Sequence, residues 1–313
     1  MKKLVAMFLA LTMLVSVACV AMAAGTYPDG TVTFICPWDA GGSSDLITRK
    51  IADMFAQKTG AKTAVENQGG AGGTVATSAF ANAAADGYSI CQEAIGVFTL
   101  QPFTREVSYS IDDFKPVAML SVEPILLLVP SSSGITDLKG LLDKGSLLYG
   151  YSGAGSLMEL SQKKLFADAG VDAVGIPYDG SSPTLTALLG GFVDCAVSHP
   201  GEALPYLESG DLTAIGIFGA ERDNREAFSG IATIKEQGYD VCMSVWKFMI
   251  VPANTPADVL ETLTGILSEI TASEEYQEFC TMNNLMYEAL TPDQMLERIK
   301  AEASVNQALL AGN

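Results

Sequence analysis

Three Gly/Ser-rich loops carry the residues of this 313-residue sequence whose types and spacing suit anion binding. They span residues 40–45, 71–74 and 152–156, and an expected helix follows each loop. The first turn of a helix leaves backbone N–H groups without an intrahelical partner and carries a partial positive charge. Glycine lets a ligand approach the backbone, and Ser and Thr hydroxyls add donors. The pattern predicts a site where main-chain amides replace the water around a carboxylate.

The candidate ligand contacts in these loops are Ala40, Gly41, Gly42, Ser43, Ser44, Asp45, Ala71, Gly72, Gly73, Thr74, Ser152, Gly155 and Ser156. The hydroxyl residues are equally suited to capping helices, and the glycines to forming turns. Asp45 is expected to brace its loop rather than to meet an anion. Trp38, just before the first loop, is open to two interpretations, a wall of the cleft or a core residue.

His199 is the only histidine, so a Ser-His-Asp triad would have to use it. Residues 150–154 lack the final glycine of a Gly-x-Ser-x-Gly elbow, and Met158 stands where a Gly-x-Gly-x-x-Gly motif starting at Gly153 needs glycine. The sequence has no Gly-Lys dipeptide and therefore no P-loop. We expect no catalytic residue and no cofactor, and we interpret His199 as lining the cleft or capping a helix.

An alternative hypothesis is an exported, hydrolase-like α/β enzyme that uses His199 or the carboxylate pair of Asp39 and Asp45, because a fold does not exclude a function.

The N-terminus is typical of a signal peptide. Lys2 and Lys3 precede an apolar run over residues 4–20, and Ala21 and Ala23 suit a cleavage site, which predicts a signal peptide over residues 1–23 and a periplasmic or extracytoplasmic location. Lipid anchoring through Cys19 is an alternative. The five later cysteines form no Cys-x-x-Cys pair, so no metal site is expected and buried free thiols are the favoured interpretation.

The charge balance excludes one class of partner. The formal net charge is -18, and removal of Lys2 and Lys3 with the signal peptide changes it to -20. Binding to nucleic-acid phosphates needs a basic face, so no nucleic-acid partner is expected. An acidic protein can still bind an anion where the site itself is locally positive.

Strands and helices must alternate to position these loops. Apolar and β-branched runs predict strands over residues 31–36, 62–66, 88–91, 125–129, 147–151, 173–176, 193–198, 213–218 and 285–288. Helical spacing or start signals predict helices from about residue 46, over 74–85, 136–142 and 157–169, and after Pro256 and Pro292. This alternation predicts mostly parallel sheets with right-handed crossovers, arranged in two lobes.

Six motifs in chain order resemble those of the tripartite tricarboxylate transporter solute receptors, the Bug/TctC-like periplasmic receptors. They are residues 36–45, 66–74, 86–88, 176–181, 188–194 and 251–256. The resemblance implies a type II periplasmic-binding-protein fold, in which two α/β lobes are joined by strands that cross near residues 122–125 and 245–248. It places residues 24–123 and 247–313 in the first lobe and residues 124–246 in the second.

The resemblance also implies function. It implies a non-enzymatic receptor that closes around a small carboxylate, which is a di- or tricarboxylate, an acidic amino acid or an aromatic acid, and delivers it to a membrane permease. The fourth motif adds Tyr178, Gly180 and Ser181 as ligand contacts, although Tyr178 also suits a structural hydrogen bond. Trp246 and Lys247, at the expected crossing, are the last two candidate ligand contacts, and Lys247 is the one cation that we consider as a ligand partner.

Three further points qualify this picture. Gln68 and Gly69 replace a common Arg-Pro pair, and Asp179 replaces a frequent lysine, which makes a polyanionic ligand less suitable. A ligand-sensing receptor for a signalling kinase is an alternative to the transporter receptor. A monomer is the default expectation.

Overall fold

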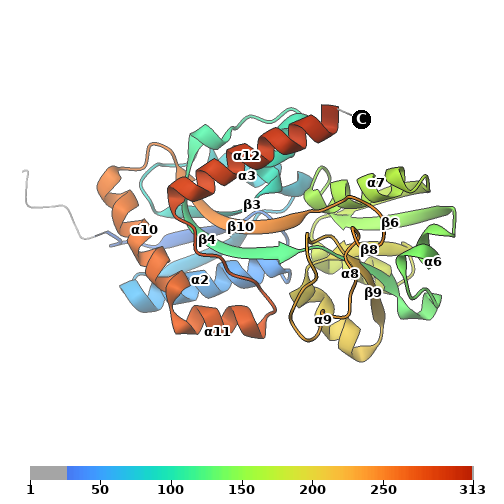
Figure 1. The fold of residues 1–313 in the computed structure, drawn as a ribbon. Helices are drawn as coiled ribbons and strands as arrows, with labels where there is room; N and C mark the ends of the chain where they lie inside the picture. Colours follow the sequence, from blue (N-terminus) through green and yellow to red (C-terminus); the bar gives the residue numbers. More distant parts are fainter. Residues whose placement is uncertain (1–26, 312–313) are drawn as a thin grey trace, which may run out of the picture.

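Two mixed sheets, each in its own lobe, organise residues 27–311, which are the residues that this computed structural model describes (Figure 1). The expected signal peptide over residues 1–23 and Cys19 lie outside the described residues. Sheet A has the strand order β2-β1-β3-β10-β4, and sheet B has the order β7-β6-β8-β5-β9. The two-lobed α/β architecture expected from the sequence is confirmed.

The strands of sheet A are β1 (Val32–Cys36), β2 (Thr63–Asn67), β3 (Ser89–Ala94), β4 (Phe114–Pro124) and β10 (Ser244–Pro252). Those of sheet B are β5 (Leu126–Pro130), β6 (Ser146–Ser152), β7 (Asp172–Tyr178), β8 (Cys195–Ser198) and β9 (Leu212–Ile217). In each sheet one strand, β10 or β5, runs antiparallel to both of its neighbours, whereas the other pairs are parallel. The two sheets therefore share one strand arrangement.

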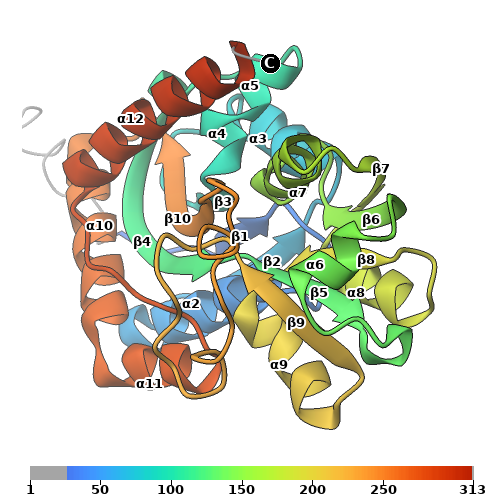
Figure 2. The same cartoon turned by 45° about the vertical axis from the view of Figure 1, so that its right-hand side comes forward.

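Helices cover both faces of each sheet. They are α2 (Ser43–Thr59), α3 (Thr74–Phe80), α4 (Gly96–Thr99), α5 (Gln101–Thr104), α6 (Leu138–Leu142), α7 (Leu157–Asp168), α8 (Ser181–Leu189), α9 (Pro200–Ser209), α10 (Ala257–Ala272), α11 (Glu274–Met282) and α12 (Pro292–Ala311). In sheet A, α2, α10 and α11 pack on one face, and α12 lies along the other (Figure 2). The last helices of the chain thus return to the sheet A lobe.

The crossing between lobes is direct. β4 of sheet A ends at Pro124 and β5 of sheet B begins at Leu126, and the chain returns through β10, which begins at Ser244. β4 and β10 pair antiparallel along their length, so the two connections lie side by side. β10 joins sheet A upstream of the expected boundary at 246/247.

Side chains alternate along β10 and build two cores. Trp246 and Phe248 pack in the cluster that includes Ile299 of α12, whereas Met249 packs with Ile47 of α2. Successive residues of a strand point to opposite faces. Lys247 therefore belongs to the face covered by α2, directly opposite the side chain of Trp246.

Two expectations about local structure are wrong. Residues 285–288 form no strand; Met286 makes one isolated bridge to Val122 at the edge of sheet A before the chain continues to α12. The helix expected over residues 74–85 ends at Phe80. Cys36, Cys91, Cys195 and Cys280 are buried free thiols, as expected, but Cys242 is exposed.

Two glycine loops touch each other between the lobes. A Cβ atom added to Gly153, after β6, would lie 2.7 Å from Cα of Gly72, which belongs to the short 3-10 turn Ala71–Gly73. Both glycines have positive φ, +80 and +66. The carbonyl of Ala154 accepts hydrogen bonds from Gln101 (3.1 Å) and from Arg105 (2.7 Å) of the other lobe. The contact therefore depends on the absence of side chains.

We predict that Gly153→Ala keeps the lobes apart. The added methyl would meet Gly72, so the radius of gyration measured by small-angle X-ray scattering should exceed that of the wild type. Gly145→Ala is the matched control, because Gly145 also has positive φ (+71) but has no neighbour within 4 Å. Both variants should lose about 1–2 kcal/mol of stability through backbone strain. Equal radii of gyration for the two variants would show that the contact does not govern closure.

Candidate functional site

A cavity between the lobes lies at the carboxyl ends of the parallel strands of both sheets. It encloses about 610 Å³ of space between atoms, open solvent at its mouth included. Loops after β1, β2, β3, β6, β7 and β8 line it, together with residues of β10. Ligands of α/β folds bind outside the carboxyl ends of strands, where loops and helix N-termini converge. The cavity is therefore the candidate site.

The structure brings eleven of the candidate residues to this cavity. They are Trp38, Gly42, Ser43, Ser44, Gly72, Ser152, Ser156, Gly180, Ser181, His199 and Lys247. Residues from all three Gly/Ser loops and from the fourth motif thus share one cavity, with walls from both lobes.

Nine candidates do not line it: Ala40, Gly41, Asp45, Ala71, Gly73, Thr74, Gly155, Tyr178 and Trp246. Asp45 instead braces its loop, accepting hydrogen bonds from Gly41 N (3.0 Å) and Asn67 (2.9 Å) and pairing with Arg49. Burial acts against ionisation of Asp45, but these partners hold its pKa below the usual value. Its carboxylate is committed to the loop.

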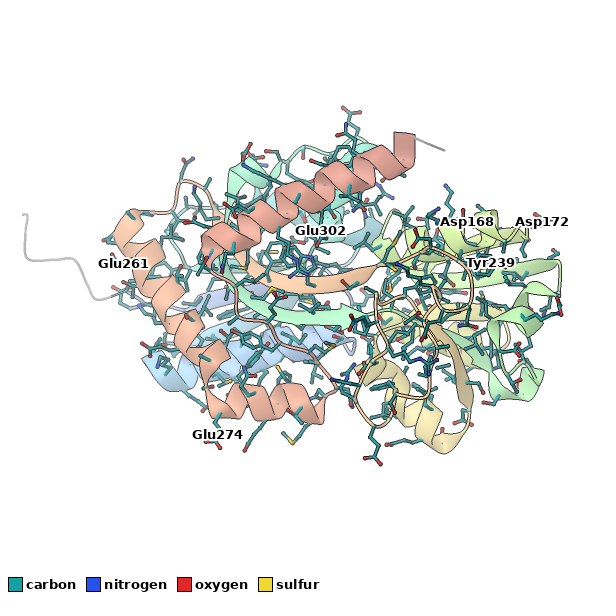
Figure 3. All side chains as sticks on the ribbon, in the orientation of Figure 1. Asp168, Asp172, Tyr239, Glu261, Glu274 and Glu302 are labelled. Atoms are coloured by element: carbon teal, nitrogen blue, oxygen red, sulfur yellow. The ribbon has the colours of Figure 1, made fainter. Side chains whose placement is uncertain are left out.

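Trp246 is buried in the core, on the face of β10 away from the cavity. Its Nε1 donates to Oε1 of Glu302 at 2.9 Å, and the guanidinium of Arg298 lies 5.0 Å from its ring centroid. Figure 3 shows Glu302 on α12 above the strand. Trp246 therefore anchors α12 to sheet A.

Sequence reasoning missed three polar residues of the site. Gln101 and Glu202 line the cavity, and Glu123 lies directly behind Lys247. Glu123 and Lys247 are opposite charges within the largely apolar segments around residues 122–125 and 245–248, which were expected to cross, and that signal was available in the sequence. Gln101 and Glu202 have no comparable signal, because both lie on helices with ordinary polar positions.

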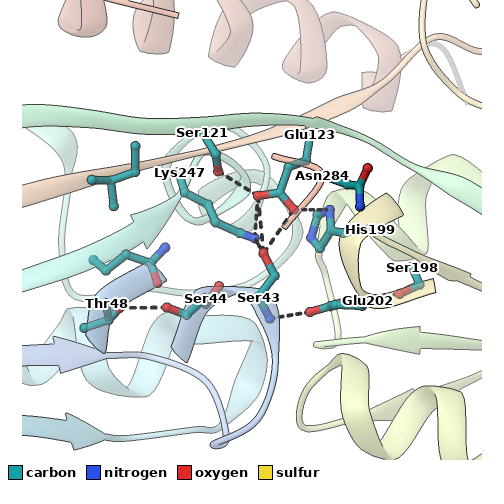
Figure 4. Close-up of polar contacts among 12 residues, drawn as sticks. Ser43, Ser44, Thr48, Ser121, Glu123, Ser198, His199, Glu202, Lys247 and Asn284 are labelled. Atoms are coloured by element: carbon teal, nitrogen blue, oxygen red, sulfur yellow. Dashed lines mark hydrogen bonds and ion pairs between the residues drawn. The ribbon is translucent and has the colours of Figure 1, made fainter. Parts of the chain in front are cut away.

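A buried ion pair lies next to Ser43 at the N-terminus of α2 (Figure 4). Nζ of Lys247 lies 2.8 Å from Oε1 of Glu123, and the two side chains are 2% and 1% exposed. Ser121, opposite Lys247 in the register of β4 and β10, donates to Glu123 at 2.6 Å. Ser43 Oγ donates to Oε2 of Glu123 at 3.0 Å and accepts from Lys247. The charge of Lys247 is thus matched by a protein carboxylate.

The charge states in this cluster follow from burial and from Lys247. Burial opposes ionisation of Glu123, yet the charges of His199 in its protonated form and of Lys247, with the hydrogen bonds from Lys247 and Ser121, lower its pKa to about 2. Burial lowers the pKa of His199, and Lys247 adds to this against the opposing effects of Glu123 and Glu202. His199 is therefore neutral near pH 7, and Lys247 supplies the charge that keeps Glu123 ionised.

His199 is only partly satisfied in this arrangement. Its Nδ1 lies 3.3 Å from Oε2 of Glu123 but outside hydrogen-bonding geometry. The side chain is 7% exposed and faces the cavity. The neutral imidazole therefore has a polar nitrogen that is available to hydrogen-bond a molecule in the cavity.

A carboxylate of the protein itself occupies the N-terminus of α2. Glu202, on α9 of the sheet B lobe, accepts a hydrogen bond from the backbone N of Ser43 in the sheet A lobe, and its other oxygen accepts from Ser198 at 3.0 Å (Figure 4). The N-cap residue of α2, Gly42, has no side chain to cap these amides. Glu202 therefore caps α2 from the opposite lobe and joins the two lobes.

The helix ends of the sheet B lobe differ from one another. At α7, Ser156 accepts from Glu159 N, and Glu159 accepts from Gly155 N at 2.6 Å, so the helix caps itself. At α8 the N-cap is Gly180, and no side-chain cap is present there. Ser181, the first residue of α8, is buried and lines the cavity. The N-termini of α8 and of α9, whose N-cap His199 also makes no side-chain cap, therefore keep capacity to bind an anion.

The family pattern described as the tripartite tricarboxylate transporter family receptor matches residues 47–310. The chain belongs to this family. Its architecture agrees with solved structures of relatives. MatC from Rhodopseudomonas palustris with bound malate is 27% identical with a TM-score of 0.83, and the match covers 90% of this chain and 99% of MatC.

Two further solved structures match equally well. A second Rhodopseudomonas palustris protein, with adipate, is 26% identical with a TM-score of 0.85, covering 91% of this chain and 98% of its own. The periplasmic binding protein BugD is 26% identical with a TM-score of 0.84, over the same shares. The receptor family and the two-lobed periplasmic-binding-protein fold expected from the motifs are therefore confirmed. Within residues 27–311, no helix is both long and apolar enough to span a membrane.

We predict that Lys247→Met destabilises the protein by about 3–5 kcal/mol, because it leaves Glu123 buried without its cation. The double variant with Glu123→Gln should recover much of this loss, which urea unfolding would measure. Lys139→Met is the control, since its solvent-exposed pair with Asp143 should contribute little to stability. Additive losses in the double variant would contradict a coupled pair.

Acidification should remove the contribution of ionised Glu123 to the stability of the folded protein. Its folded-state pKa, about 2, lies below the ordinary value of 4.5, so its stabilising effect is complete above about pH 4.5 and is lost as pH falls toward 2. We expect the difference in unfolding free energy between the wild type and Glu123→Gln to narrow across this window. A difference that stays constant from pH 6 to about pH 2.5 would contradict the lowered pKa.

Proposed function

We propose that this receptor captures a small carboxylate in the cavity between its lobes and passes it to a membrane permease. The observation that carries the proposal is the uncapped N-terminus of α8, which lines a cavity shared with the opposite lobe. Backbone amides, Ser181 and the hydroxyls of Ser44 and Ser152 are the donors for the ligand. All of the candidate contacts that line the cavity are part of this proposed site.

The class of ligand is suggested by the relatives. MatC is described with bound malate and the second Rhodopseudomonas palustris protein with adipate, and both ligands are small carboxylates. Hydrogen bonds to a charged group contribute about 1.5–3 kcal/mol each, so a few such bonds support micromolar affinity after the cost of association. With hydrogen-bond donors of this kind, the site can bind a carboxylate without an arginine.

Closure of the lobes accompanies capture in this proposal. We propose that residues 24–123 and 247–313 move as one lobe and residues 124–246 as the other, with β4 and β10 as the bending connection. Binding then shifts the population toward the closed form, because the ligand has contacts to both lobes only there. The touching glycine loops at Gly72 and Gly153 suit such a closed form.

We also propose the cellular setting. The signal peptide over residues 1–23 would direct export, and the receptor would act as a monomer in the periplasm, where it meets its permease. The ligand-sensing alternative shares the capture step and differs only in the partner that reads the closed form.

The geometry supports binding rather than catalysis. Ser43 and His199 both face the same carboxylate, Glu123, on different sides (Figure 4). A nucleophilic serine needs the base to accept its own proton, but the Ser43 hydroxyl donates to Glu123 and accepts from Lys247. Asp45 is committed to its loop, so it does not form a reactive pair with Asp39.

Calorimetric titration with mono-, di- and tricarboxylates and amino acids tests capture. We predict that Ser181→Ala weakens the best ligand about tenfold, because a donor to a charged group is lost. Ser182→Ala is the matched control, because Ser182 is adjacent, exposed and outside this cavity. Silence of the folded wild type across the whole panel would refute capture of a small carboxylate.

A further inference from the structure

The charged side chains that face the cavity are unbalanced. Among the described residues, those that line it include one cation, Lys247, and two carboxylates, Asp39 and Glu202. Lys247 is 2.8 Å from Glu123 and buried with it, so its charge is already matched. The cavity therefore presents two carboxylates to a ligand and no side-chain cation that is available to one.

Neighbouring groups do not restore the balance. Burial keeps His199 neutral near pH 7, so it adds no positive charge. Arg49 pairs with Asp45, and Arg105 donates to the carbonyls of Ala71 and Ala154. Neither arginine lines the cavity. The remaining positive potential comes from the helix N-termini, each equivalent to about half an elementary charge.

Glu202 also takes one of those helix ends. Its Oε1 accepts from the backbone N of Ser43, at the place on α2 where a carboxylate of a ligand would otherwise bind. A carboxylate oxygen has more than one lone pair, so Glu202 keeps acceptor capacity toward the cavity that it lines. A second carboxylate on the ligand would meet this negative group instead of an amide donor.

We propose that the ligand is a zwitterion, with one carboxylate at the N-terminus of α8 and an ammonium group at Glu202. The inference rests on the proposed capture of a small carboxylate and names its class as amino acids rather than dicarboxylates. Glu202 is then the residue that determines specificity. It balances the ammonium charge, while its hydrogen bond to Ser43 holds its carboxylate in place at the junction of the lobes.

The test compares ligands that differ only at one end. Succinate, glutarate and adipate are titrated calorimetrically against β-alanine, γ-aminobutyrate and δ-aminovalerate, which keep each chain length and replace one carboxylate with an ammonium. L-alanine and L-glutamate, titrated beside propionate and glutarate, extend the comparison to α-amino acids. We expect the amino-acid members to bind at least about tenfold tighter than their matched acids, the effect of one hydrogen bond to a charged group.

The variant Glu202→Gln sharpens the test. It should weaken the binding of the best amino acid by about tenfold or more and strengthen the binding of the matched dicarboxylate. The preference for the amino acid over the dicarboxylate should therefore narrow or reverse. Glu208→Gln, an exposed glutamate on the same helix, should leave both affinities unchanged.

The outcomes separate the two proposals. Tighter binding of dicarboxylates by the wild type overturns the zwitterion inference while capture of a carboxylate stands. Silence of the wild type toward every compound overturns capture itself and this inference with it. The wild-type comparison decides the question even if Glu202→Gln fails to fold.

Discussion

The buried ion pair between Lys247 and Glu123 is the interaction on which the cleft depends. It lies where β4 and β10 pass from one lobe toward the other, and Ser43 at the start of α2 bonds to it. A lone charge in this position would be strongly destabilising, so each residue requires the other. The pair fixes the first turn of α2 relative to the crossing strands. It also withdraws the one lysine of the cavity from direct charge pairing with a ligand, which leaves recognition of an anion to backbone amides and hydroxyls.

Glu202 connects the second lobe to the same first turn of α2. An anion at a helix N-terminus satisfies amides that otherwise need water or a ligand. Because Glu202 comes from α9 and reaches Ser43 in the opposite lobe, this bond exists only when the lobes are close together. In the closing movement proposed above, this bond stabilises the closed form without a ligand. A ligand therefore binds to an interface that is already partly formed. Less of its binding free energy is then lost to conformational reorganisation than in a receptor without this bond.

Much of the fold and part of the site could be predicted from residue patterns. The strand, loop and helix at residues 32–59 and 146–168 carry clear turn and periodicity signals, and residues from those loops do reach one cavity. The alternation of side chains along a strand also predicts that Trp246 and Lys247, which are neighbours on β10, point to opposite faces of the sheet. Treating both as ligand contacts ignored this constraint, and Trp246 lies in the core. Glu202 could not be found in this way, because its role depends on how one lobe approaches the other.

The glycine loops show why a motif does not state its own purpose. Gly72 and Gly153 have positive φ, which alone explains their presence. Their backbones also meet across the lobes at a separation that excludes any side chain, and the carbonyl of Ala154 is held by Gln101 and Arg105. A pattern suited to cradling an anion is used here to let two lobes touch. The helix N-termini nearby differ in the groups that cap them. α7 is capped by its own side chains, α2 is capped by Glu202, and α8 has no side-chain cap. Of these three helix ends, only that of α8 leaves its first-turn amides without a side-chain cap, so a ligand carboxylate placed there in the proposed site competes with no group of the protein.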